Sequence, residues 1–176
     1  MTTLLPEPGP TTDVRELFLT YLDHYRESVA DTVEALGEER AREFRLPSGW
    51  APIELVKHLT FMERRWVVWG IAGAAVTEPW GDSVDERWTV GPDESVAELL
   101  AALRGSGAAT RRIVGARALD AASAAGGRFP KGREEPPSVV AVLFHVLQEY
   151  ARHAGHLDIV RELIEDGQRT RNSSTE

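Results

Sequence analysis

The amino-acid sequence predicts an all-α protein, a four-helix bundle with a long loop between its second and third helices. Two observations indicate this fold class. Apolar residues recur at the three- and four-residue spacing of amphipathic helices in four separate segments. The segments are divided by connectors containing proline and glycine, and none shows the sustained alternation of a half-buried strand.

The first two helices are predicted over residues 12–36 and 51–70. Thr12 or Asp13 can cap the first helix, and Gly37 is expected to end it. Pro52 falls in the first turn of the second helix, where proline is tolerated. His58 lies on the apolar stripe of that helix, so we expect its side chain to face the core.

The connection over residues 71–92 has no sustained periodicity and is long for a small domain. Such loops are often functional or mobile. Trp80 and Trp88 belong to it, and two roles are open for them. They could line a site that the loop covers, or they could only anchor the loop to the bundle.

The third helix is predicted over residues 93–114, with Ser95 and Glu98 forming a capping box. The fourth covers residues 138–166, between two prolines and Gly167, which is expected to end it. We therefore expect a flexible tail at residues 1–11, one domain at 12–167 and a disordered tail at 168–176.

The composition excludes several classes of function. A net charge of −8 disfavours nucleic acid and anionic membranes as partners. No apolar run reaches the roughly 18–20 residues of a membrane span, and the start lacks the basic region of a signal peptide. We expect a cytoplasmic protein. With no cysteine, the chain can supply neither a thiolate metal ligand nor a catalytic thiol of its own.

The fourth helix carries the most informative pattern. Its apolar face is interrupted by Glu149 and, one turn later, by His153. Burying such groups without partners costs about 2–7 kcal/mol even for a neutral polar group. A metal ion bound by Glu149, His153 and His58 would satisfy all three, and three protein ligands with an open fourth position are typical of catalytic zinc. The same donors suit Ni²⁺, Fe²⁺ or Mn²⁺.

Other arrangements of these groups remain open. Glu149 and His153 could form a buried hydrogen-bonded pair with arginine or tyrosine neighbours. His145 or His156 could take the place of one ligand, although the helical period puts both off the centre of the stripe. Glu54 lies one turn before His58 and is interpreted as a first-turn carboxylate favoured by the helix dipole.

These motifs also carry a family resemblance. The segments LVKHLTFMERRW around His58 and EYARHAGHL around Glu149 and His153 resemble the DinB-like superfamily of four-helix metalloproteins over roughly residues 12–166. Most members have histidine at the position of Glu149. With glutamate there, the sequence resembles the branch containing mycothiol-dependent maleylpyruvate isomerase and related thiol S-transferases. The isomerase has a further C-terminal domain, whereas this chain ends at Glu176, so we expect thiol transfer rather than isomerisation.

The resemblance implies zinc held by His58, Glu149 and His153, and a small thiol, mycothiol, attacking a small electrophile. The arginine-rich, lysine-poor composition is compatible with an actinobacterial source, where mycothiol is the expected thiol. From the helical period, Arg65 shares the face of His58 and Arg152 lies near Glu149; either could bind a substrate carboxylate. Catalytic residues are not assigned.

Two further expectations complete the sequence-based picture. The alternative function is a non-enzymatic binding or stress-response module with a structural or vestigial metal site. Phe144, opposite the apolar stripe of the fourth helix, would allow a homodimer.

Overall fold

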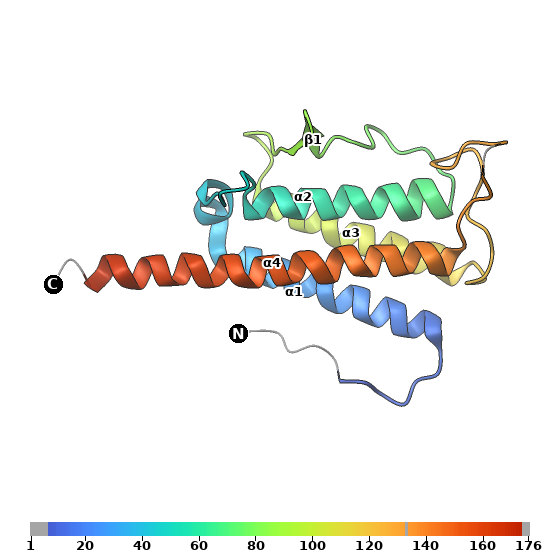
Figure 1. Ribbon diagram of the computed structural model, residues 1–176, viewed down its shortest axis with the longest axis horizontal. Coiled ribbons are helices and arrows are strands. Elements are labelled where there is room, and N and C mark those ends of the chain that lie inside the picture. Colours follow the sequence, from blue (N-terminus) through green and yellow to red (C-terminus); the bar gives the residue numbers. More distant parts are fainter. Residues whose placement is uncertain (1–6, 133, 174–176) are drawn as a thin grey trace.

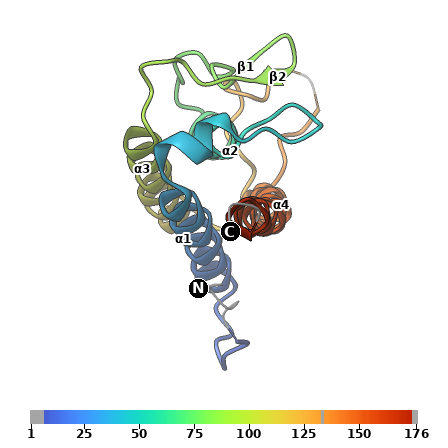
Figure 2. The same cartoon turned by 90° about the vertical axis from the view of Figure 1, so that its left-hand side faces the viewer.

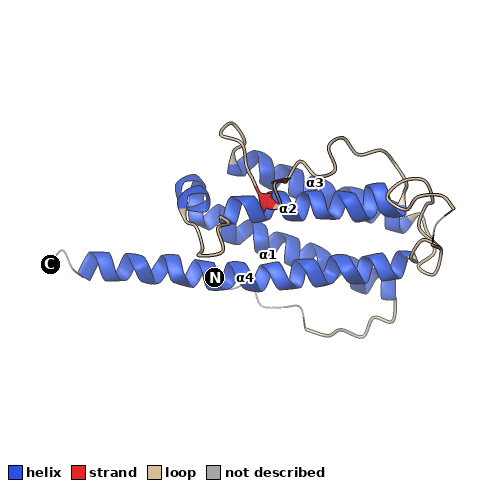
Figure 3. Cartoon of the chain, turned by 45° about the horizontal axis from the view of Figure 1, so that its top comes forward, coloured by secondary structure: helices blue, strands red, loops and turns tan. Residues whose placement is uncertain are grey.

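The computed structural model describes residues 7–132 and 134–173, with side chains as far as residue 167. Its helices are α1 (Val14–Glu43), α2 (Pro52–Glu63), the π-helix η1 (Arg64–Ile71), α3 (Val96–Gly115) and α4 (Val139–Ser173). A two-residue hairpin, β1 (Ser83–Val84) and β2 (Arg87–Trp88), lies between η1 and α3. The predicted all-α four-helix bundle is confirmed (Figures 1 and 3).

The helix packing places the long loop outside the bundle. α2 and α4 run in opposite directions alongside each other (Figure 1). The β1–β2 hairpin lies on the side of α2 that faces away from α1, as the end-on view also shows (Figure 2). α4 therefore meets the C-terminal part of α2 with its own N-terminal part, and the loop passes over the outer side of α2.

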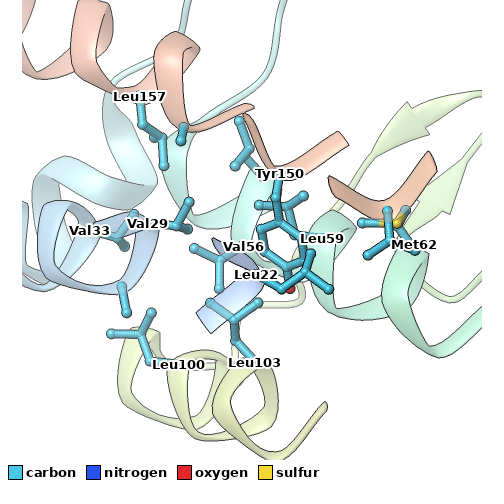
Figure 4. Packing of buried hydrophobic residues seen from close by; sticks show 14 of the residues in the cluster. Leu22, Val29, Val33, Val56, Leu59, Met62, Leu100, Leu103, Tyr150 and Leu157 are labelled. Atoms are coloured by element: carbon cyan, nitrogen blue, oxygen red, sulfur yellow. The ribbon is translucent and has the colours of Figure 1, made fainter. Parts of the chain in front are cut away.

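The core is built from all four helices. Leu22, Leu59, Leu103 and Leu157 contribute one fully buried side chain from each helix (Figure 4). Burying a leucine side chain stabilises the fold by about 1.5–3 kcal/mol relative to leaving it exposed. Among the described residues, no helix is long and apolar enough to cross a membrane.

Two helix starts agree with the sequence. The Asp13 carboxylate accepts hydrogen bonds from the backbone N–H groups of Arg15 and Glu16, so Asp13 is the N-cap of α1. Ser95 and Glu98 form the predicted capping box of α3. Local side chain-to-backbone hydrogen bonds therefore determine both starts.

One predicted helix end is confirmed and one is wrong. Gly37 adopts a non-helical conformation, φ 74° and ψ 169°, so the first segment of α1 ends there as predicted, and a second helical segment continues to Glu43. Gly167 does not end α4, which continues to Ser173. A glycine inside a helix costs about 1 kcal/mol relative to alanine, and a long packed helix tolerates that cost. Residues 1–6 and 174–176 of the two predicted tails lie outside the described residues.

Candidate metal centre

The three predicted ligands converge in the structure. His58 comes from α2, and Glu149 and His153 come from successive turns of α4. One donor atom from each lies within 4.8 Å of the other two. His153 is buried with 8 % of its side chain exposed, whereas the Glu149 side chain is 26 % exposed. The cluster therefore opens towards solvent on its Glu149 side.

The pair on α4 places a carboxyl group beside a neutral imidazole. Glu149 Oε2 lies 3.3 Å from His153 Nε2. Burial, with smaller contributions from His58, His156 and Arg152, lowers the pKa of His153 to about 3. His153 is thus in its neutral, ligand form at neutral pH. No described arginine or tyrosine side chain hydrogen-bonds Glu149, which leaves the buried-pair alternative without its expected partners.

A buried carboxylate orients His58 from behind. Asp82 Oδ2 lies 3.1 Å from His58 Nδ1, so assigning the proton to Nδ1 leaves Nε2 with a free lone pair. Arg65 donates two hydrogen bonds to Asp82, at 2.6 and 3.1 Å. Burial would raise the pKa of Asp82, but the hydrogen bonds from His58 and Arg65 outweigh it and lower the pKa below its usual value. Asp82 is therefore a carboxylate that holds a histidine, as is common around metal ligands.

The β1–β2 hairpin covers the centre with one aromatic ring. Trp88 stacks on His58 with ring centroids 4.1 Å apart and also contacts the edge of His153 at 5.4 Å. Trp50 also packs against Trp88, with ring centroids 6.0 Å apart. Trp80 lies elsewhere, over the guanidinium of Arg65. Of the two loop tryptophans, Trp88 lines the candidate centre.

The other residues considered as ligands, His145, His156 and Glu54, lie outside the cluster of three. His145 Nε2 is 3.7 Å from the second oxygen of Glu149, and His156 Nδ1 is 3.4 Å from His153 Nδ1. The carboxylate of Glu54 accepts a hydrogen bond from the backbone N–H of residue 51 and forms an ion pair with Arg45. It serves the start of α2, as its position in the first turn suggested.

The two arginines predicted to bind ligand are placed differently. Arg65 is 4 % exposed and is engaged by Asp82 and by the carbonyl of Pro79, so it lies behind His58. Arg152 is exposed on α4, next to His153 in the sequence. The structure thus puts Arg65 in contact with the group that positions a ligand, and leaves Arg152 facing solvent.

The donor set fits a divalent ion. Zinc–nitrogen and zinc–oxygen bonds are about 2.0–2.2 Å long, so the donors would have to move closer together than 4.8 Å. Glu149 is the most exposed of the three side chains and has the most room to move. Two imidazoles and one carboxylate leave a fourth position for a ligand.

Sequence reasoning missed Asp82, because it lies in an irregular loop where spacing carries no information about direction. The only available signal was its place in the tryptophan-containing connection. Sequence reasoning also missed the π-helical turn that directs Arg65 towards Asp82.

Fold and site together define a class: a DinB-like four-helix bundle with a candidate His₂Glu metal centre. A crystal structure of a conserved protein from Enterococcus faecalis is similar in fold, with a TM-score of 0.65 and 16 % identity, covering 89 % of this chain and 99 % of that one. No curated protein matches the sequence. The family model described as Mycothiol-S-transferase matches residues 17–166. The chain therefore belongs to the mycothiol S-transferase family, which confirms the resemblance seen in the sequence.

Proposed function

We propose that the protein is a zinc-dependent S-transferase that activates a small thiol, mycothiol, for attack on a small electrophile. His58, Glu149 and His153 hold the ion. The observation that carries this proposal is the convergence of these three donors from two helices. Membership of the mycothiol S-transferase family supports the thiol.

The bound ion would lower the pKa of a thiol in its open position, so that the thiolate forms near neutral pH. The chain's own residues prepare this position. Asp82 and Arg65 fix the ring of His58, and Trp88 covers it. The partly exposed Glu149 side leaves room for thiol and electrophile to enter. Transfer forms a bond between the sulfur and an electrophilic carbon while another bond of that carbon breaks. Either a π bond opens and its far atom takes up a proton, or a leaving group departs with its electron pair and the thiol proton passes to solvent.

Ni²⁺ is a competitor for the same donors, because selectivity among divalent ions at nitrogen and oxygen sites depends on geometry and metal availability more than on affinity. Arg152 remains a proposed ligand contact at the exposed rim. Arg65 is proposed as a positioning residue that acts through Asp82.

Metal content tests the ligand assignment directly. Protein purified without chelator or affinity tag should contain about one zinc per chain by mass spectrometry. His58→Ala and His153→Ala should each lose it. His24→Ala is the matched control, since His24 packs on Tyr25 in α1, away from the cluster. Zinc-free wild-type protein that takes up neither zinc nor nickel would contradict the proposal.

Chelator sensitivity distinguishes a bound ion from a hydrogen-bonded pair. An ion present at several hundred times its dissociation constant adds about 3–4 kcal/mol to the free energy of unfolding. Addition of chelator should therefore lower the melting temperature of wild-type protein and leave that of His153→Ala unchanged. Equal melting temperatures with and without chelator would favour the non-enzymatic alternative.

A further inference from the structure

Arg128 is a cation with no anionic partner among the described side chains. It is half-buried, and its guanidinium lies 4.0 Å from the ring centroid of Trp66 and 5.6 Å from that of Trp80. No described side chain forms a hydrogen bond or an ion pair with it. Burial, and then the charge of Arg65, lowers the pKa of Arg128. Its environment therefore supplies aromatic walls and lacks a negative charge.

The backbone around Arg128 is held in place. The N–H of Arg128 donates to the carbonyl of Trp69 at 3.2 Å, and the N–H of Gly126 donates to the carbonyl of Phe129 at 2.7 Å. At Gly127, an added Cβ would lie 2.3 Å from the carbonyl oxygen of Trp69, so only glycine permits this approach. The loop is therefore packed on the end of η1, and the direction of Arg128 is built into the fold.

Arg128 is connected to the candidate metal centre through two rings. Trp66, on which it stacks, lies 4.4 Å from the ring of His145, and His145 Nε2 is 3.7 Å from Glu149. His145 precedes Glu149 by one turn of α4, a rise of about 5–6 Å. The guanidinium is thus joined to the candidate ligands by a continuous chain of contacts through Trp66 and His145.

We propose that Arg128 binds the carboxylate of the electrophile, and that Trp66 and Trp80 form the walls against which a flat, unsaturated or aromatic body of that electrophile lies. This inference rests on the proposed transferase function. A planar guanidinium pairs with a carboxylate through two parallel hydrogen bonds, and aromatic faces beside it favour flat ligands. An electrophile held there lies at the end of the contact chain that leads through Trp66 and His145 to Glu149.

Two compounds with the same ring and leaving group, one carrying a charged and one a neutral acyl group, test the site. In 4-chloro-3-nitrobenzoate and 4-chloro-3-nitrobenzamide, a carboxylate and a neutral amide stand opposite the same reactive carbon. Calorimetric titration without thiol is done on zinc-loaded and on metal-free protein, because a carboxylate can also bind zinc. Wild-type protein is expected to bind the benzoate about tenfold more tightly than the amide in both forms, the change typical of one hydrogen bond to a charged group.

Arg128→Gln should abolish the preference for the benzoate. Arg128→Lys should retain part of it, because lysine keeps the charge but lacks the paired N–H donors of the guanidinium. Arg112→Gln, at an exposed arginine of α3, should keep the full preference. A melting curve of each variant checks folding. Absence of a preference in wild-type metal-free protein, or its persistence in Arg128→Gln, would overturn the inference. This binding result stands whether or not the protein transfers thiols.

Turnover separates electrophile from thiol. The thiolate sulfur bonds to the ring carbon, chloride leaves with its bonding pair, and the thiol proton goes to solvent. With rates divided by those of the uncatalysed reactions, Arg128→Gln should raise KM for the benzoate about tenfold and leave KM for the amide and for the thiol unchanged. A rise in KM for the thiol instead would assign Arg128 to the thiol and overturn the proposal. Charge-selective binding without turnover would count against the transferase function alone.

Discussion

At the residue scale, Asp82 has a greater influence on the candidate centre than its absence from the ligand set suggests. It is 2 % exposed, holds Nδ1 of His58 and receives two hydrogen bonds from Arg65. A carboxylate in this place fixes the tautomer of the histidine and raises its basicity. Asp82 therefore links the loop over residues 72–95 to the chemistry of α2.

We expect Asp82→Asn to weaken zinc binding about 10–100-fold although all three ligands are retained. The amide keeps the shape of the side chain but removes the charge that orients His58 and balances Arg65. Competition with a chromophoric zinc chelator measures the affinity. Asp85→Asn, at the tip of the same hairpin, is the control and should bind zinc as wild type does. Unchanged affinity in Asp82→Asn would show that His58 needs no partner.

At the scale of elements, the transition from α2 to the π-helix η1 changes which residues face the site. The N–H of residue 72 donates to the carbonyl of Val67, five positions earlier, at 3.0 Å. A π turn alters the angular spacing that an α-helical period assumes, and such turns occur often at functional sites. Within η1, Arg65 points to Asp82 and Trp66 points to His145. The turn thus serves both the metal centre and the proposed carboxylate site.

Replacing two glycines of α3 by alanine should change the free energy of unfolding in opposite directions. At Gly105 an added Cβ meets nothing within 4 Å, so Gly105→Ala should raise the free energy of unfolding by about 0.4–1 kcal/mol. At Gly107 the Cβ would lie 2.5 Å from the guanidinium of Arg26, which is buried and paired with Glu63. Gly107→Ala should therefore destabilise, by about 1–3 kcal/mol as overpacking does. Urea unfolding of both variants measures this, and changes of equal sign would contradict the packing described.

At the scale of the whole molecule, the sequence predicts those features that follow from helical periodicity. His58, Glu149 and His153 interrupt apolar stripes, so their inward direction follows from the helical period, and the structure brings them together. Whether they bind an ion stays a prediction. Asp82 and Arg128 lie in loops, and their surroundings arise only from tertiary contacts, so no local sequence pattern indicates their roles. Likewise, Gly167 is only a weak stop signal, and the long packed helix α4 continues past it.

The four helices also meet at one buried carboxylate. Glu63, at the end of α2, accepts hydrogen bonds from Arg26 of α1 at 2.8 Å, Thr110 of α3 at 2.6 Å and Tyr150 of α4 at 2.7 Å. It is 1 % exposed. Because Tyr150 is adjacent to Glu149, this network fixes α4 beside the candidate ligands. Its satisfied hydrogen bonds offset the cost of burying the charge.

We expect Glu63→Gln to lower the free energy of unfolding by about 3 kcal/mol, because Arg26 remains buried with only Asp23, itself part-exposed, as a charged partner. In the double variant Arg26→Met/Glu63→Gln no unbalanced charge remains, so its loss should be clearly smaller than the sum of the two single losses. Urea unfolding of metal-free protein measures all three variants without a contribution from ion binding. Additive losses, or a change below about 0.5 kcal/mol in Glu63→Gln, would show that hydrophobic packing alone holds the four helices in register.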